Sequence, residues 1–428
     1  MNQMADTSLK NVLLTGATGV LGGRLLQELL LSTQCNVHCL VRAKDEAQGL
    51  ERIKEVLFAY DEAGLLSNQV NRIRPVLGDV SQPQFGLQDS LYRDLAGLCD
   101  MAMHCAANVS LVASYAKIAP VNVGGVANVI EFCLAARASL MYTSSFSMTG
   151  DKLYEPGFVL KESDLDVGQG FEDMAYERSK YDAEQLVHAA SARGLDWVIV
   201  RPGNIWGDSV TGCYPLKQTK VKGIYYEMLK SLVETGLSFP SDEDFDITPV
   251  DYVAKASLFA MLNLPATRHC TYNLTNPAPI TYNDIVQQMR RFGYRIDEID
   301  TKRYFEAVQE GRMMRAGKPY RSTFTDLMAI FYDGSDCKEA AKYDTSKIEA
   351  LLSGSNITCH ACDHNLMQRY LDYAIKCEFL APPKDQFPLA QISDASVRGG
   401  GYMESLYDAD LSQLKQLSEA THAASRTA

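Results

Sequence analysis

The sequence lacks a long apolar run, a basic N-terminal signal and an excess of positive charge. No window approaches the ~20 apolar residues that span a bilayer, and residues 1–6 have neither the basic start nor the apolar stretch of a secretory signal. Lys and Arg number 41 against 53 Asp and Glu, which gives a formal net charge of −12. Such a chain repels phosphate backbones and anionic lipid. We therefore expect no membrane span and no nucleic-acid partner.

The sequence also lacks the cysteine pattern of a disulfide framework. Its eleven cysteines are odd in number and irregularly spaced, as is typical of reduced core residues. The segment Cys359-His360-Ala361-Cys362-Asp363-His364 has no second Cys-X-X-Cys to complete a zinc site. We expect no metal there, only reduced side chains beside a helix start. These absences predict a soluble cytoplasmic protein.

The first half of the chain alternates short apolar runs with helix-length segments. With 428 residues, of which 46% are apolar and 22% charged, the chain has room for two to three globular domains. Strand-like runs lie at residues 11–15, 37–41, 74–77, 101–105, 139–143 and 197–200. Continuous apolar strands that alternate with helices predict an α/β fold of the Rossmann type, a doubly wound parallel sheet.

A glycine-rich turn follows the first predicted strand and opens the first predicted helix. Glycines there let the backbone approach a pyrophosphate, whose charge is stabilised by N–H groups at the helix start. A glycine triplet alone is also compatible with an ordinary strand–helix turn, and the flanking elements are what favour a dinucleotide. The predicted binding residues are Gly16, Thr18, Gly19, Val20, Leu21 and Gly22.

The end of the second predicted strand indicates which dinucleotide binds. Arg42 stands where an NAD site usually has a carboxylate. An arginine cannot accept from a ribose 2′-hydroxyl, but it can donate two hydrogen bonds to a 2′-phosphate. We therefore predict NADPH as the cofactor. Arg52 is either a second phosphate ligand or a charge on a helix surface.

Two further strand ends carry residues suited to the rest of the cofactor. Asp79, followed by Val80, can accept a hydrogen bond from an adenine amino group after the third strand. Ala106 and Ala107 follow the fourth strand, and their small side chains leave room for ribose and diphosphate. We interpret His104 as a packed residue rather than a catalyst.

Tyr176 and Lys180 are the strongest candidates for chemistry. Residues four apart share one helical face, so the phenol and the ammonium can converge. A neighbouring Lys⁺ and a positive nicotinamide ring favour phenolate and bring the pKa of the phenol nearer working pH. Such a tyrosine can protonate an oxygen as hydride reaches the attached carbon. Ser144 and Ser145, at the end of the fifth strand, can bind the same oxygen, although this tyrosine–lysine spacing alone also fits a surface pair.

Taken together, these motifs resemble the extended short-chain dehydrogenase/reductase family. The segments 201–207 (Arg-Pro-Gly-Asn-Ile-Trp-Gly) and 248–253 (Thr-Pro-Val-Asp-Tyr-Val) strengthen the resemblance. Several other stretches are similar to the thioester reductase domains that terminate non-ribosomal peptide synthetases and carboxylic acid reductases. These stretches are residues 39–43, 78–81, 106–109, 122–123, 370–373 and 379–383, and the similarity covers about residues 8–385.

The resemblance implies reductive release of an acyl or peptidyl group held as a thioester on a carrier protein, or on CoA. It gives Tyr176 the role of proton donor, Ser145 (or Ser144) that of oxygen ligand, and Lys180 that of ligand to the nicotinamide ribose. Pro202, Gly203 and Asn204 would flank the nicotinamide. The product would be an aldehyde, or an alcohol after a second hydride. Many relatives have Thr in place of Ser145, and most are fused to modules that this chain has no room for.

Two other functions share these motifs. A fatty acyl-CoA reductase has the same cofactor and Tyr/Lys chemistry, whereas a redox sensor binds NADP without turnover and typically lacks the Tyr/Lys pair. Sugar-nucleotide epimerases and hydroxysteroid dehydrogenases fit the arginines less well. Residues 286–321 hold nine basic and five acidic side chains. This stretch is either a docking face for an acidic carrier protein or a solvated helix surface.

The alternation of strands and helices weakens after Pro202. We predict an NADP-binding Rossmann domain over residues 1–204, with residues 248–264 returning to it as a helix. Residues 205–247 and 265–385 are assigned to a smaller mixed α/β, mostly helical, substrate-binding lobe. Residues 386–428 form a polar tail, for which partial disorder is favoured over an amphipathic helix at 411–420.

Overall fold

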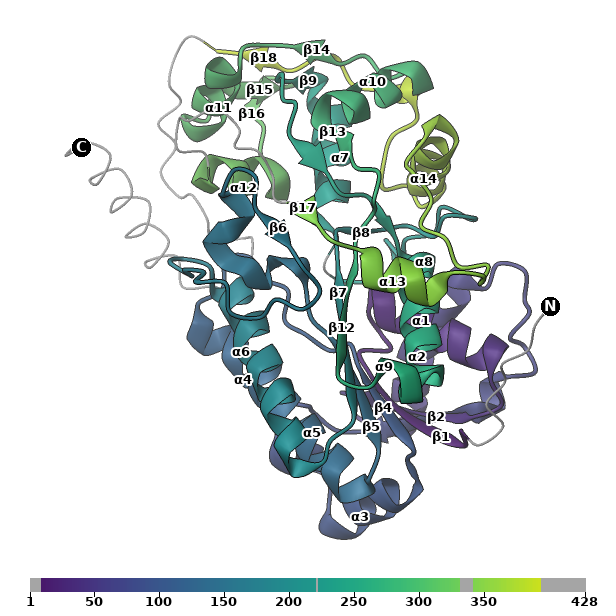
Figure 1. Cartoon of the computed structure of the whole chain (residues 1–428). Coiled ribbons are helices and arrows are strands. Elements are labelled where there is room, and N and C mark those ends of the chain that lie inside the picture. The colour runs from purple at the N-terminus through teal and green to yellow at the C-terminus, as the bar shows by residue number, and fades with distance from the viewer. Residues whose placement is uncertain (1–8, 221, 332–341, 394–428) are drawn as a thin grey trace. The chain divides into compact units, whose positions relative to one another are not determined.

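The computed structural model describes residues 9–220, 222–331 and 342–393, which fold into two compact units (Figure 1). The first unit comprises the described parts of Met1–Lys220, Phe245–Ile280 and Lys338–Tyr373. The second comprises the described parts of Val221–Asp244, Thr281–Cys337 and Ala374–Ala428. The chain therefore passes between the units several times.

A seven-stranded parallel sheet forms the centre of the first unit. Its order is β12-β7-β5-β4-β1-β2-β3. The strands are β1 (Asn11–Thr15), β2 (Asn36–Val41), β3 (Ile73–Leu77), β4 (Met101–His104), β5 (Ser139–Thr143), β7 (Trp197–Pro202) and β12 (Cys270–Leu274). Pro75 lies in β3, an edge strand, where the missing N–H leaves no ladder bond unmade. The sheet is the doubly wound Rossmann type that the alternation predicted.

Helices cover both faces of this sheet (Figure 1). One layer holds α1 (Val20–Ser32), α2 (Glu46–Tyr60) and α8 (Val250–Leu262), and the other holds α3 (Asp89–Leu98), α4 (Tyr115–Asn122), α5 (Gly124–Ala136) and α6 (Ala175–Ala190). The first unit also contains α9 (Leu264–Thr267), α13 (Ser346–Leu352), β6 (Val159–Leu160), β8 (Ile205–Trp206), β11 (Thr248–Pro249) and β17 (Lys342–Tyr343), and 3₁₀ turns at Val70–Arg72, Pro83–Gly86, Phe146–Tyr154 and Ser191–Arg193.

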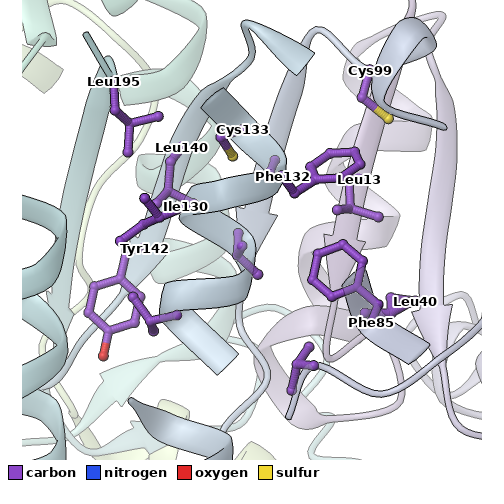
Figure 2. Close-up of a cluster of buried hydrophobic side chains, with 14 of the residues drawn as sticks. Leu13, Leu40, Phe85, Cys99, Ile130, Phe132, Cys133, Leu140, Tyr142 and Leu195 are labelled. Carbon is purple, nitrogen blue, oxygen red and sulfur yellow. The ribbon is translucent and has the colours of Figure 1, made fainter. Parts of the chain in front are cut away.

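A large apolar cluster lies between this sheet and the layer that contains α5. Figure 2 shows Phe132 on α5 beside Phe85, with ring centroids 5.5 Å apart, and Leu140 and Tyr142 on β5. Each apolar side chain that is fully buried in this way contributes about 1.5–3 kcal/mol. Such burial fixes the strand ends whose loops carry the candidate site.

The stretch Tyr115–Ala136, which forms α4 and α5, is long and apolar enough to cross a membrane by composition. The expectation that no window would reach this level was therefore wrong. The reason for its apolar composition is packing, because Val126, Val129 and Phe132 are fully buried in the cluster just described. The stretch reads as the core helices of the α/β unit.

The second unit is mostly helical in its described residues. Its helices are α7 (Ile224–Thr235), α10 (Tyr282–Phe292), α11 (Thr301–Gln309) and α12 (Thr323–Phe331), and its short strands are β9 (Leu237–Ser238), β14 (Asp297–Glu298), β15 (Met313–Arg315), β16 (Lys318–Pro319) and β18 (Gln391–Ile392), with a 3₁₀ turn at Pro383–Asp385. Helix α10 begins with a capping box between Thr281 and Asp284 and ends at Gly293, where φ is +116°. Phe239 stacks on Tyr282 and contacts Phe305 in its core.

Three elements lie where the units meet in the sequence. They are β10 (Asp244–Phe245), β13 (Ile280–Thr281) and α14 (His364–Lys376).

The domain boundaries differ from those expected. Residues 265–280 do not belong to the second lobe, because β12 pairs with β7 and completes the sheet. Residues 205–220, 245–247 and 342–373 also lie in the first unit, where β17 pairs with β6. The apolar run of β12 is short and isolated from any helix–strand repeat, so the sequence pattern gave it no place in the sheet. Residues 394–428, including the helix considered at 411–420, lie outside the described residues.

Candidate active site

The glycine-rich turn between β1 and α1 is packed against the chain that leaves β4. Gly16 has φ +79°, and a Cβ there would lie 2.8 Å from the backbone nitrogen of Ala106. A Cβ at Gly22 would lie 2.1 Å from the carbonyl oxygen of Gly16. Gly19 caps α1 without a side-chain acceptor, so the first N–H groups of the helix remain open to an anion. This is the close-packed cradle that a pyrophosphate requires.

Thr15 and His104, at the ends of β1 and β4, connect these two strands next to the glycine-rich turn. The Thr15 hydroxyl accepts from the backbone N–H groups of Cys105 (3.2 Å) and Ala106 (3.1 Å), and it lies 2.7 Å from His104 Nδ1. Burial, with a smaller contribution from Lys180, lowers the pKa of His104 to about 3. His104 is therefore neutral, and it ties the ends of β1 and β4 together.

Tyr176 and Lys180 lie in the first turns of α6, beside the end of β5. Lys180 is 3% exposed, and its Nζ donates to the carbonyl oxygen of Thr143 at 2.8 Å. The same Nζ lies 5.8 Å from the centroid of the Tyr176 ring. Ser145 neighbours the Tyr176 phenol and acts to lower its pKa. The geometry thus brings together the phenol, the ammonium and the hydroxyl that the sequence analysis selected.

Burial dominates the electrostatics of this group. It lowers the pKa of Lys180 to about 8, although the nearby Cys105 and Glu184 act in the opposite direction. Burial, with the charge of Glu177, raises the pKa of Tyr176 above its usual value, and the neighbouring Ser145 only partly offsets this. In the protein alone, Lys180 does not bring the phenol nearer to neutral pH as we expected. Tyr176 is therefore a protonated, half-buried acid.

Two contacts that the sequence analysis did not use fix α6. Asn122 on α4 donates to Ser179 Oγ (2.9 Å), and its Oδ1 accepts from the backbone N–H of Asn108 (2.7 Å). Ser179 in turn donates to the carbonyl oxygen of Tyr176. Asn108 and Asn122 appeared in the sequence only as part of a family resemblance. A buried asparagine in an otherwise apolar helix is the signal that could have indicated this role.

A fully buried ion pair holds the other side of α6. Arg201 on β7 donates to Glu184 through Nε (2.9 Å) and Nη2 (2.7 Å), and both side chains are 0% exposed. Glu184 lies one helical turn after Lys180. Arg201 also donates to the backbone carbonyls of Lys161 and Asp164. The catalytic helix is thus tied to β7 and to the segment around β6.

The residues predicted to bind the 2′-phosphate of the cofactor lie at an exposed end of the site. The Arg42 side chain is 74% exposed, and its Nη1 lies 3.8 Å from Asp79 Oδ2. Arg52 donates from Nη1 to the carbonyl oxygen of Arg42. Asp79 also accepts from the N–H and hydroxyl of Ser81. Arg52 thus holds the backbone of Arg42, a role that neither of the two readings from the sequence included.

The remaining predicted residues lie at the carboxyl edge of the same sheet, where ligands of such folds bind. Val80 follows β3 and contacts α5, because its carbonyl accepts from Asn128 Nδ2 at 2.8 Å. The others are Gly16, Thr18, Gly19, Val20, Leu21 and Gly22 after β1, Ala106 and Ala107 after β4, Ser144 and Ser145 after β5, and Pro202 and Asn204 at the end of β7.

The cysteine–histidine segment lies at the start of α14. Cys359 and Cys362 are not in disulfides, and α14 begins at His364, as expected from the sequence. Burial raises the pKa of Cys362 to about 12, so this thiol is unreactive. Within residues 9–220, 222–331 and 342–393, no group of three or more His, Cys, Asp or Glu is arranged to hold a metal ion.

Comparison with known families identifies the chain. Residues 14–257 match the NAD-binding family described as male sterility protein. The chain belongs to this family. The chain is 30% identical over 368 residues to a component of the linear gramicidin synthase of Brevibacillus parabrevis, an alignment that covers 84% of this chain and 7% of that protein. It is 32% identical over 310 residues to the large subunit of L-2-aminoadipate reductase from Penicillium chrysogenum, covering 69% and 21%. It thus spans less than a quarter of these two relatives.

Solved structures share the fold of this chain. The terminal R domain of the myxalamid PKS-NRPS pathway superposes with a TM-score of 0.78 and 29% identity, over 89% of this chain and 94% of that one. An archaeal thiolation-reductase di-domain gives a TM-score of 0.69 at 23% identity, over 88% and 77%. Yeast Gre2, solved with NADPH, shares only the fold, with a TM-score of 0.61 at 17% identity over 86% and 99%.

Proposed function

We propose that this chain reduces an acyl thioester, held on the phosphopantetheine arm of a carrier protein, to an aldehyde with NADPH. The observation that carries the proposal is the position of Lys180, whose Nζ lies 5.8 Å from the centroid of the Tyr176 ring and donates to the carbonyl oxygen of Thr143, two residues before Ser145. The reductase domains of peptide synthetases among its relatives support the thioester substrate.

The residues at the strand ends fit NADPH. A Cβ at Gly16 or Gly22 would clash with backbone atoms of Ala106 or of Gly16, so the glycines keep the tight strand–helix turn that dinucleotide sites use. Arg42 is exposed and paired only at 3.8 Å with Asp79. An exposed pair contributes at most about 1 kcal/mol, so Arg42 can leave Asp79 for a 2′-phosphate. NADPH, when bound, supplies the hydride.

The protein's own groups complete the reaction. As hydride adds to the thioester carbonyl carbon, Tyr176 gives its phenolic proton to the oxygen, which the Ser145 hydroxyl orients. The C–S bond of the tetrahedral thiohemiacetal then breaks while its hydroxyl returns the proton to the Tyr176 phenolate. The carbonyl re-forms as an aldehyde, and the thiolate leaves and takes up a proton from solvent. Lys180 stabilises the transient phenolate and can donate to the nicotinamide ribose.

Two of the basic residues in the stretch 286–321, the predicted docking face for a carrier protein, have partners within the second unit. Arg312 binds Glu310 and the carbonyl of Ser393, and the Arg315 guanidinium lies 3.9 Å from the centroid of the Phe387 ring. These two arginines therefore support the fold of that unit. We assign docking of an acidic carrier to exposed basic residues of the same stretch, namely Arg291, Arg303 and Lys318.

The state of the cysteines supports a proposal for the cellular compartment. None of the ten cysteines in the described residues forms a disulfide, as is usual in a reducing environment. We place the enzyme in the cytoplasm.

Product analysis tests the proposed function. The protein is incubated with NADPH and one acyl group presented as a carrier-bound or a CoA thioester, and products are identified by mass spectrometry. We expect aldehyde formation matched by NADPH consumption, faster with the carrier than with CoA. Equal rates would indicate an acyl-CoA reductase. Cofactor binding without NADPH consumption in either arm would indicate a sensor and contradict the proposal.

A further inference from the structure

A buried carboxylate outside the catalytic group lies beneath the end of β7. Asp246, between β10 and β11, is 8% exposed. Its Oδ2 accepts from the backbone N–H of Asn204 at 2.5 Å, and its Oδ1 accepts from that of Asn276 at 2.6 Å. The Thr248 hydroxyl donates to it at 2.9 Å. One carboxylate therefore joins the segments that follow β7 and β12 to the start of β11.

The segment after β7 is packed directly on this carboxylate. A Cβ at Gly203 would lie 1.9 Å from Asp246 Oδ2, so no larger residue fits there while the carboxylate holds Asn204. The backbone N–H of Gly203 donates to the carbonyl of Leu274. Backbone ladder bonds to Thr248 continue the same contact. The position of residues 203–204 thus depends on where Asp246 lies.

Asp246 differs from an ordinary buried carboxylate in its partners. Among the described residues, every group bound to it is a neutral donor. The titratable groups that face it are Tyr252 and Cys359, whose pKa values are raised partly by its charge. Burial raises the pKa of Asp246 to about 6, although its three hydrogen bonds act in the opposite direction. Its ionisation therefore falls in an accessible pH range.

We propose that Asp246 is a positioning residue that, as a carboxylate, holds Gly203 and Asn204 in the conformation that binds the nicotinamide half of the cofactor. The cofactor role of this segment rests on the proposed function. Protonation would place a hydrogen among three donors, so that at least one of them must turn away. The bond to the Asn204 N–H is the shortest of the three and the one that positions the proposed site.

The contribution of Asp246 to the free energy of unfolding should respond to pH in the opposite direction to its contribution to cofactor affinity. The pKa of Asp246 is raised in the fold above the ~3.9 of an unfolded aspartate, so the folded chain holds the proton more tightly. Its contribution to stability therefore increases as pH falls from about 6 to about 4. A loss of cofactor affinity in the same window cannot come from acid unfolding at this residue.

The test is direct binding of NADP⁺ to the full chain by calorimetry at pH 5–7.5, with no thioester present. It compares Asp246→Asn with a matched control, Asp251→Asn. Asp251 is equally buried and also accepts three hydrogen bonds, but from Ser209 and Lys255. The cofactor's own 2′-phosphate titrates near pH 6. The result is therefore the difference in affinity between each variant and the wild type at the same pH.

We expect Asp246→Asn to weaken binding about tenfold at pH 7.5, because an amide replaces a charged acceptor. Between pH 7.5 and pH 5 the NADP⁺ affinity of the wild type should fall about tenfold more than that of Asp246→Asn. Asp251→Asn should keep the wild-type affinity and pH profile, whatever its effect on thermal stability. Wild-type binding and pH dependence in Asp246→Asn, or an equal loss in both variants, would overturn the proposal.

A second variant covers the case in which Asp246→Asn does not fold. Gly203→Ala forces a Cβ against Oδ2 and leaves the titrating group in place. Weaker NADP⁺ binding with a retained acid dependence is expected, and unchanged affinity would contradict the proposal. Because no thioester is used, failure of this test is distinct from failure of the proposed reaction.

Discussion

The two ends of the proposed cofactor site are built in opposite ways. At the nicotinamide end Lys180 is 3% exposed, and burial has shifted the pKa values of Lys180 and Tyr176. At the 2′-phosphate end the Arg42 side chain is 74% exposed and its pairing with Asp79 is long. Desolvation prepares the first end for proton transfer. Solvent and salt screen the charges of the second end, where we propose that Arg42 selects NADPH by bidentate hydrogen bonding to its 2′-phosphate. Changes at the first end should affect turnover and pH dependence, and changes at the second should affect cofactor affinity and salt dependence.

The largest effect is expected from Tyr176→Phe. Removing the general acid should lower kcat by about 10³-fold, within the range for such groups, while the NADPH dissociation constant changes by less than about twofold. Stopped-flow NADPH oxidation and fluorescence titration measure the two quantities. Ser147→Ala, which alters a neighbour of Ser145 without removing the acid, is the control. A Tyr176→Phe variant with more than a tenth of wild-type kcat would remove the catalytic assignment.

Lys180 should give the next largest effect. Lys180→Met should lower kcat about 10²-fold and weaken NADPH binding as well, unlike Tyr176→Phe. Because burial lowers the pKa of Lys180 to about 8, the ammonium is present below that pH and is lost above it. Wild-type kcat should therefore fall as pH rises through about 8. Lys180→Arg should move this alkaline limb upward, since a guanidinium stays charged. An unchanged limb in that variant would assign the titration to another group.

At the exposed end, Arg42→Ala should act on affinity alone. Losing a charged hydrogen-bonding partner of the 2′-phosphate should raise the KM for NADPH about 10- to 100-fold, with little change in kcat or in the KM for NADH. The dependence of the NADPH KM on salt should weaken at the same time. Steady-state kinetics with both cofactors at two salt concentrations measure this. Equal losses for NADPH and NADH would show that Arg42 does not contact the phosphate.

Arg52→Ala should have the smallest effect. Arg52 donates to the carbonyl oxygen of Arg42, and losing one exposed hydrogen bond corresponds to about threefold to tenfold in NADPH KM. Lys44→Ala, which removes an exposed cation two residues after Arg42, is the matched control and should change the KM less. A loss as large as that of Arg42→Ala would make Arg52 a direct phosphate ligand.

Local sequence patterns were enough to predict six of the seven strands and the order of the site segments along the chain. Gly16 lies in a short glycine-rich turn, and Tyr176 and Lys180 lie one helical turn apart, so the spacing of these residues in the sequence records their arrangement directly. The ties between distant segments left no such pattern. Asn122 reaches Asn108 and Ser179, and Asp246 reaches Asn204 and Asn276. Such polar residues resemble ordinary turn or helix residues until the fold brings their partners together.

The same reason explains why the sequence analysis did not assign β12 to the sheet. A parallel strand is recognised from sequence by its place in a strand–helix repeat. β12 follows α8 and the short α9 after a long excursion of the chain into the second unit. Only its pairing with β7 shows that it belongs to the sheet.

Deuterium transfer tests the central claim most directly. NADPH carrying deuterium at the transferring position of C4 is incubated with the enzyme and a carrier-bound acyl thioester. The account predicts an aldehyde with one deuterium on its carbonyl carbon, formed in proportion to the NADPH consumed. Release of the acyl group as a carboxylic acid, or as an aldehyde without deuterium, would contradict it.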